Sequence, residues 1–113
     1  MSDSCLFCRI ARKEIPAAIV MENDHVVAFR DIDPKAPTHV LIVPRTHIAT
    51  LSDATDPGVL GELMLAAASV ARMEGIDAGG YRAVVNSGAD AGQTVFHVHV
   101  HVLGGRKLAW PPG

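Results

Sequence analysis

The chain has 113 residues, of which 49% are hydrophobic and 19% are charged, and its formal net charge is −2 at pH 7. This length fits a single domain over residues 1–113, with a core of limited size. The weakly negative charge excludes a strong positive field that would attract DNA or RNA, so any nucleotide would have to be recognised by a local site. The high apolar content of so small a chain favours a subunit interface, and we expect a homodimer.

The N-terminus shows no apolar run after a basic segment, so we predict no signal peptide. The most apolar stretch, Val59–Met73, is interrupted by Gly61, Glu62, Ser69 and Arg72. An interrupted stretch of this length does not predict a membrane span. We therefore expect a protein without membrane association, located in the cytoplasm.

Apolar periodicity and turn residues divide the chain into a short helix, three strands, a long helix and two further strands. In chain order these elements are expected over residues 5–11, 19–21, 25–30, 39–43, 56–74, 81–86 and 95–103. The first two strands are joined by a turn and should form a hairpin, and the almost wholly apolar third strand should be central. Strands grouped around one crossover helix predict an α+β fold with a largely antiparallel sheet.

The long helix has clear signals at both ends. Asp56 is a suitable N-cap, Pro57 fits the first turn, and Gly75 fits the C-cap. The expected core stripe is Leu60, Leu63, Met64, Ala67, Val70 and Ala71, and it is widened by Val59, Leu65, Ala66, Ala68 and Met73. A helix that is apolar nearly all round is usually covered on more than one side, and here a second subunit would provide the cover.

Three histidines alternate with valines in the last predicted strand. This period of two places His97, His99 and His101 on one face. Alternate residues of a strand are roughly 6.6 Å apart, so the outer two histidines are about 13 Å apart and cannot share one metal ion. A solvated polar face would more often contain Thr, Lys and Glu. The pattern therefore favours a catalytic role for this face.

The segment His97–Leu103 resembles the motif His-φ-His-φ-His-φ-φ of the histidine triad (HIT) superfamily. The preceding Gly92-Gln93-Thr94-Val95 resembles the Gly-Gln-Ser-Val of its Hint branch. Further segments that resemble this branch are residues 13–17, 29–39, 104–106 and 110–113. The likeness covers nearly the whole chain and implies a HIT-like fold, with a mainly antiparallel sheet, one long and one short helix, and a homodimeric assembly.

The resemblance implies a hydrolase of purine nucleoside phosphoramidates or aminoacyl adenylates that acts at the α-phosphate and releases a nucleoside monophosphate. His99, the middle histidine, would attack the phosphorus and form a nucleotidyl-histidine intermediate. Neutral imidazole is a competent nucleophile near pH 7, and a backbone carbonyl is expected to orient the ring. His101 and His39 would support proton movement and phosphate binding, although a purely structural role for His39 remains open.

Phosphate and ribose contacts are also implied. Gln93 and Thr94 can present a carboxamide, a hydroxyl and backbone N–H groups to phosphate oxygens, although Thr94 stands where the family usually has Ser. Asp31 would accept hydrogen bonds from ribose hydroxyls. Asn86 matches a phosphate- or ribose-side asparagine, with a turn residue as the alternative. The implied nucleotide-binding residues are Phe7, Ile10, Phe29, Asp31, Ile32, Asn86, Gly92, Gln93, Thr94, Val95, His99 and His101, the catalytic ones His99, His101, Thr94 and His39.

Cys5 and Cys8 form a Cys-x-x-Cys pair, which alone is ambiguous between zinc binding and redox chemistry. Some superfamily members combine such a pair with a histidine equivalent to His47 and with the first triad histidine. The resemblance therefore implies a Cys2His2 set of Cys5, Cys8, His47 and His97, suited to structural zinc. Many Hint-branch proteins bind no zinc, so this remains a possibility, and no cofactor is expected for catalysis.

Two alternatives to a phosphoramidate hydrolase stay open. The first is a dinucleoside polyphosphate hydrolase, as in another branch of the superfamily, although the tail Trp110–Gly113 favours Hint. The second is a nucleotide-binding or zinc-stabilised interaction module with negligible turnover. A phosphoramidate assay separates an enzyme from a binding module.

Overall fold

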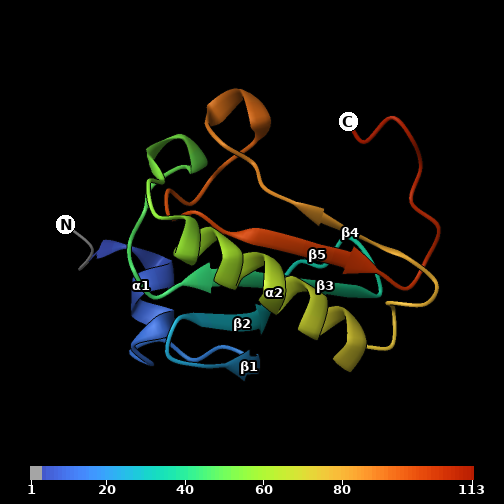
Figure 1. Ribbon diagram of the computed structural model, residues 1–113, viewed down its shortest axis with the longest axis horizontal. Coiled ribbons are helices and arrows are strands. Elements are labelled where there is room, and N and C mark those ends of the chain that lie inside the picture. Colours follow the sequence, from blue (N-terminus) through green and yellow to red (C-terminus); the bar gives the residue numbers. More distant parts are fainter. Residues whose placement is uncertain (1–3) are drawn as a thin grey trace.

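The computed structural model describes residues 4–113, so residues 1–3 of the predicted domain lie outside the described residues. Within the described chain, a five-stranded sheet is combined with one short and one long α-helix (Figure 1). The elements are α1 (Leu6–Ala11), β1 (Ile19–Glu22), β2 (Val26–Arg30), β3 (Thr38–Pro44), η2 (Leu51–Asp53), α2 (Pro57–Met73), β4 (Tyr81–Val84), η3 (Ala89–Ala91) and β5 (Val100–Gly104). The predicted α+β class is confirmed, and no helix among the described residues is both long and apolar enough to cross a membrane.

The strands lie in the order β1-β2-β3-β5-β4, and every neighbouring pair is antiparallel. The predicted hairpin of β1 and β2 and the predicted central strand β3 are both present. Every residue of β3 is buried, including Thr38 and His39 at its start, as its almost wholly apolar sequence predicts. Helix α2 connects β3 to β4 and crosses one face of the sheet (Figure 1).

Local sequence explains where the two helices begin. The Asp56 carboxylate accepts a 2.8 Å hydrogen bond from the backbone N–H of Gly58, and Pro57 occupies the first turn of α2. The helix ends at the cap residue Glu74, and Gly75 follows with φ +72°, a conformation that glycine adopts at little cost. The Cys5 sulfur caps α1 by accepting from the backbone N–H of Cys8 at 3.4 Å.

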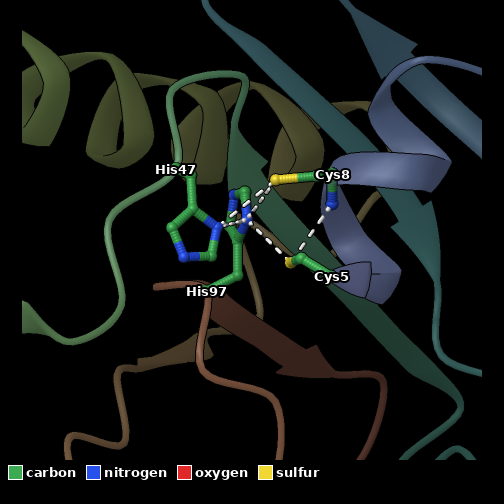
Figure 2. Close-up of side chains that lie close together, drawn as sticks. All are labelled: Cys5, Cys8, His47 and His97. Atoms are coloured by element: carbon green, nitrogen blue, oxygen red, sulfur yellow. Dashed lines mark hydrogen bonds between the residues drawn. The ribbon is translucent and has the colours of Figure 1, made fainter. Parts of the chain in front are cut away.

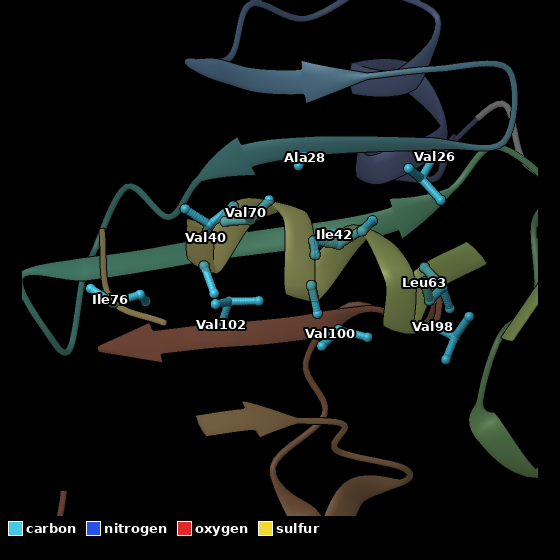
Figure 3. Close-up of a cluster of buried hydrophobic side chains, with 13 residues drawn as sticks. Val26, Ala28, Val40, Ile42, Leu63, Val70, Ile76, Val98, Val100 and Val102 are labelled. Carbon is cyan, nitrogen blue, oxygen red and sulfur yellow. The ribbon is translucent and has the colours of Figure 1, made fainter. Parts of the chain in front are cut away.

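Alternate residues of the central strands are buried on opposite faces of the sheet. One face packs against α2 through a valine-rich cluster (Figure 3) that includes Val26, Ala28, Val40, Ile42, Leu63, Val70, Val98, Val100 and Val102. The other face packs against α1 through Phe7, Ile10, Ala11, Val27, Phe29, Leu41 and Val43. The valines of the triad segment therefore face α2, and this leaves the other face for histidine side chains.

The solvent-exposed side of α2 carries large apolar side chains in addition to those on its buried side. The buried side is Leu63, Ala66, Ala67, Val70 and Ala71. Met64, predicted in the core stripe, is 47% exposed, because at 100° per residue it lies past the edge of this buried side. Leu65 and Met73 are 67% and 57% exposed. The prediction for Met64 was wrong for the single chain, and the homodimer remains a prediction.

The triad strand is shorter than predicted. β5 begins at Val100, the first residue of the segment that pairs with β3, instead of at residue 95. Two bonds divert the chain before that point: the N–H of Val98 donates to the Ile48 carbonyl at 2.6 Å, and the His97 ring bonds the Pro44 carbonyl at 2.8 Å. His97 and His99 therefore lie in an irregular segment, where they are not limited to the spacing of a regular strand.

Candidate active site and metal cluster

A cleft of about 560 Å³ opens on the sheet face opposite α2. Its lining is mainly apolar, with a few polar groups near the triad histidines. The lining residues are Leu6, Phe7, Ile10, Ile15, Pro16, Ala17, Ala18, Phe29, Arg30, Asp31, Ile32, Leu41, Thr94, Val95, His99 and His101. An apolar cleft with a few convergent polar groups is the usual form of a small-molecule site.

Nine of the twelve predicted nucleotide-binding residues line this cleft. They are Phe7, Ile10, Phe29, Asp31, Ile32, Thr94, Val95, His99 and His101. Phe7 packs edge-on against Phe29, with ring centroids 5.5 Å apart, and Ile32 is fully exposed at the rim. The cleft also contains residues that the sequence did not indicate, among them Leu41 and Arg30. In the sequence, Leu41 is two residues away from a predicted site residue, and Arg30 is next to one.

His99 is held in one orientation and one tautomer. Its Nδ1 lies 2.7 Å from the carbonyl oxygen of His97. A carbonyl only accepts, so Nδ1 carries the proton and the lone pair of the neutral ring is on Nε2. Burial lowers the pKa of His99, which keeps the ring neutral. The expected orienting carbonyl is thus supplied by His97, and no described protein group bonds Nε2.

The groups of Gln93 that were predicted to face a phosphate are bonded within the protein. Its side chain is buried, with Oε1 accepting from the N–H of Gly88 at 2.8 Å and Nε2 donating to the carbonyls of Ala49 at 2.7 Å and Val95 at 3.1 Å. Its backbone N–H donates to the Gly88 carbonyl at 3.1 Å. These bonds tie the loop before the triad together, and the phosphate contact of Gln93 stays a prediction.

Gly92 and Asn86 also lie outside the residues that line the cleft. Gly92 ends the η3 turn with φ +89°, and its N–H bonds the carbonyl of Ala89, so its position is explained by the turn. Asn86 is half-buried and follows the end of β4 by two residues. Thr94, by contrast, is exposed on the cleft, where its hydroxyl is available to a ligand.

The four predicted metal ligands come together from three separate parts of the chain (Figure 2). Cys5 and Cys8 belong to the start of α1, His47 to the loop after β3, and His97 to the segment before β5. The Sγ atoms of Cys5 and Cys8 both lie 3.4 Å from Nδ1 of His97. Nδ1 of His47 lies 3.3 Å from Sγ of Cys8 and 3.1 Å from Nδ1 of His97.

These separations of 3.1–3.4 Å are at or slightly below the spacing of ligand atoms around one tetrahedral ion. Zinc bonds of about 2.3 Å to sulfur and about 2.0–2.1 Å to nitrogen place neighbouring ligand atoms roughly 3.3–3.8 Å apart. The Nε2 of His97 donates to the Pro44 carbonyl at 2.8 Å, so its Nδ1 lone pair faces the cysteines. Burial lowers the pKa of His97 to about 4, which keeps this ring neutral, as a ligand must be. The donor set therefore fits structural zinc.

A second group, Asp31, His39 and His101, also brings possible ligand atoms together on the cleft side. Here the backbone N–H of Lys35 donates to Nδ1 of His39 at 3.0 Å. A neutral imidazole that binds metal through Nε2 must carry its proton on Nδ1, where it would meet this N–H. The second group is therefore a hydrogen-bonded cluster and does not fit a metal ion.

The HIT domain family model matches residues 12–108. The chain is 50% identical to an uncharacterised HIT-like protein of Synechococcus elongatus, with both chains fully covered. It is 46% identical to the purine nucleoside phosphoramidase of Escherichia coli, over 96% of this chain and 92% of that protein. It is also 46% identical to a 14 kDa zinc-binding protein of Zea mays, over 96% of this chain and 87% of that protein.

Solved structures agree. A HIT family hydrolase from Legionella pneumophila matches with a TM-score of 0.95 and 49% identity, covering 97% of this chain and 100% of that one. A zinc-bound histidine triad family protein from Mycobacterium smegmatis matches with a TM-score of 0.83 and 33% identity, covering 97% of this chain and 83% of that one. These matches confirm the HIT-like fold that the triad motif implied. The chain belongs to the HIT domain family.

Proposed function

We propose that this protein is a nucleotide hydrolase that cleaves purine nucleoside phosphoramidates, or related aminoacyl adenylates, at the α-phosphate. The observation that carries the proposal is His99, a neutral ring on the cleft wall with its Nδ1 proton bonded to the His97 carbonyl and its Nε2 lone pair unused. The similarity to the phosphoramidase of Escherichia coli supports this substrate class.

The lining of the cleft supports one orientation of an AMP-like ligand. The apolar part around Phe7, Ile10 and Phe29 suits a purine base, which gains mainly by stacking and burial there. Asp31 is half-buried and would accept hydrogen bonds from ribose hydroxyls. The phosphate would then lie towards His99, His101 and Thr94.

In the first proposed step, Nε2 of His99 attacks the α-phosphorus. A nitrogen–phosphorus bond forms, the bond from phosphorus to the amine breaks, and the amine leaves with that electron pair and takes a proton from solvent. In the second step a water molecule attacks the phosphorus and passes a proton to solvent. The electron pair of the histidine–phosphorus bond returns to Nε2, and the nucleoside monophosphate is released.

Zinc, when bound by Cys5, Cys8, His47 and His97, would supply a structural cross-link between α1, the loop after β3 and the triad segment. Four protein ligands leave no open position for a substrate or a catalytic water. The ring of His97 would belong to this cluster while its carbonyl orients His99. Catalysis is therefore assigned to His99, with no cofactor.

The test is turnover of an adenosine 5′-phosphoramidate with an alkylamine leaving group, followed by release of AMP. His25→Ala is the matched control, because His25 is exposed and lies outside the cleft. We expect turnover in the unmodified protein and in the control, and its loss in His99→Ala. Faster cleavage of a diadenosine polyphosphate would instead favour the dinucleoside polyphosphate hydrolase, and no turnover of either substrate would favour a binding module.

A further inference from the structure

His39 and His101 form a direct pair on the cleft side of the sheet. In the register of β3 and β5, Leu41 lies opposite His101 and His39 lies opposite Leu103, so the two histidines are diagonal neighbours on one face. Nε2 of His39 and Nδ1 of His101 are 2.9 Å apart. One of these two nitrogens must donate and the other accept.

The backbone N–H of Lys35 decides which nitrogen donates. It points at Nδ1 of His39 across 3.0 Å, and a backbone N–H can only donate. Nδ1 of His39 therefore carries a lone pair, and the proton of the neutral ring is on Nε2. The position of Lys35 is itself held, because its carbonyl accepts from Nη2 of Arg106 at 2.8 Å.

The tautomer of His101 follows from that of His39. Since Nε2 of His39 donates, Nδ1 of His101 accepts and the proton of His101 is on Nε2. The carboxylate of Asp31 lies farther from Nε2 of His39, at 3.4 Å. His101 lines the cleft, and no described protein group bonds its Nε2. The N–H that His101 offers to a ligand is thus set by a backbone amide two hydrogen bonds away.

We propose that His39 is a positioning residue that fixes the tautomer of His101, and that His101 acts as a fixed hydrogen-bond donor to a phosphoryl oxygen and not as the proton donor to the leaving group. This role rests on the proposed function, because it concerns the same phosphoryl transfer. It distinguishes His101 from His99, whose proton is on Nδ1 and whose Nε2 carries the lone pair.

Proton balance is the argument against an acid role. If His101 gave its Nε2 proton to a leaving group, it would stay neutral only by taking the Nε2 proton of His39 onto Nδ1. His39 would then be an anion, because the Lys35 amide cannot pass its proton on. A relay that ends at a backbone amide cannot supply protons, whereas a preorganised N–H can stabilise charge on a phosphoryl oxygen. Burial lowers the pKa values of both rings, in agreement with neutral forms.

The tautomers can be read directly from the ¹⁵N chemical shifts of the ring nitrogens in histidine-labelled protein. In the unmodified protein we expect His101 with a protonated Nε2 and an unprotonated Nδ1. His39→Leu fills the site without hydrogen-bonding and should give His101 a mixture of tautomers. His39→Gln can accept from Lys35 and donate to His101, so it should restore the single tautomer. A proton on Nδ1 of His101 in the unmodified protein, or an unchanged tautomer in His39→Leu, would overturn the proposal.

Hydrolysis tests the second half of the proposal. His101→Gln keeps a donor but cannot act as an acid, whereas His101→Ala removes both. We expect His101→Gln to retain turnover within about tenfold of the unmodified protein, and His101→Ala to lose on the order of 100-fold or more. Equal losses in the two variants would identify His101 as the acid and overturn the donor role. If the unmodified protein shows no turnover, the proposed function fails, while the ¹⁵N measurement still decides the role of His39.

Discussion

The carbonyl oxygen of His97 accepts a 2.7 Å hydrogen bond from Nδ1 of His99, while the ring of His97 lies in the cysteine–histidine cluster. One residue thus joins the proposed zinc site to the proposed nucleophile. Its Nδ1 faces Cys5 and Cys8, and its Nε2 donates to Pro44. A disturbance of the cluster would reach His99 through the backbone of His97, and also through Phe7 of α1, whose ring packs edge-on against His99 with centroids 5.0 Å apart.

The first prediction concerns the metal. The double variant Cys5→Ser, Cys8→Ser should be metal-poor and less stable, yet retain measurable phosphoramidate hydrolysis at low temperature. Zinc at about 100 times its Kd would stabilise the folded state by about 2.7 kcal/mol, and the variant should lose this contribution. Serine is itself a good N-cap, so the loss is not attributable to the start of α1. Elemental analysis and thermal melts would measure both effects.

A catalytic metal predicts a different result. Activity would then vanish with the metal in a still-folded protein and would return on addition of zinc. That outcome in the double variant would contradict the structural role. If the unmodified protein contains no metal after expression with ample zinc, the zinc proposal fails and the assignment of His99 is unaffected.

Periodicity in the sequence predicted the features that depend on burial. The alternation separated Val98, Val100 and Val102 from the histidines, and these valines are indeed buried in the core. Asp56 marked the start of α2, and Gly75 marked its end to within one residue. These features depend on local chemistry and on which side chains avoid water. They require no knowledge of what the chain meets elsewhere in the fold.

Features set by long-range hydrogen bonds could not be predicted in this way. The pairing of the triad segment with β3 starts only at Val100. The N–H of Val98 bonds the carbonyl of Ile48, which is distant in sequence. The carboxamide of Gln93 is used by Gly88 and Ala49. No residue type signals that a backbone amide will meet a particular histidine ring, so the tautomers of the cleft became visible only with the geometry.

The second prediction concerns acid stability. Burial lowers the pKa of His101 to about 4 from its ordinary 6.5. Between these values the unfolded chain binds the proton and the folded protein does not, so the free energy of unfolding falls as pH drops through this window. His101→Gln removes this contribution. With saturating zinc, its Tm should fall less between pH 7 and pH 5 than that of the unmodified protein, and equal falls would contradict the assignment.

The third prediction concerns Lys13, which has φ 62° after the C-cap of α1. A residue with a Cβ is strained in this conformation by roughly 1–2 kcal/mol, and glycine is not. Lys13 also forms an exposed ion pair with Glu22 at 2.7 Å, and solvent-exposed pairs of this kind contribute little to stability. Lys13→Gly should therefore raise Tm, and Lys13→Ala, which loses the ion pair and keeps the strain, should not. A lower Tm for the glycine variant than for the alanine variant would show that no strain is relieved.

The fourth prediction concerns assembly. Met64, Leu65 and Met73 expose three large apolar side chains along α2, and a two-fold interface is the commonest way to cover such a surface. We expect light scattering to show a dimer at micromolar concentration. Leu65→Glu should shift it towards the monomer, whereas Arg9→Gln, exposed on α1 at the opposite face of the sheet, should not. A monomeric unmodified protein would refute the homodimer.

The central claim is that His99 forms the covalent bond to the nucleotide. Rapid quenching of the phosphoramidate reaction, followed by intact-mass and peptide analysis, tests it most directly. We predict a nucleotidyl adduct on His99 that forms and decays during turnover and is missing in His99→Ala, while AMP affinity in that variant stays within about tenfold, or roughly 1.4 kcal/mol. Near-normal turnover by His99→Ala, or an adduct on another residue, would contradict it.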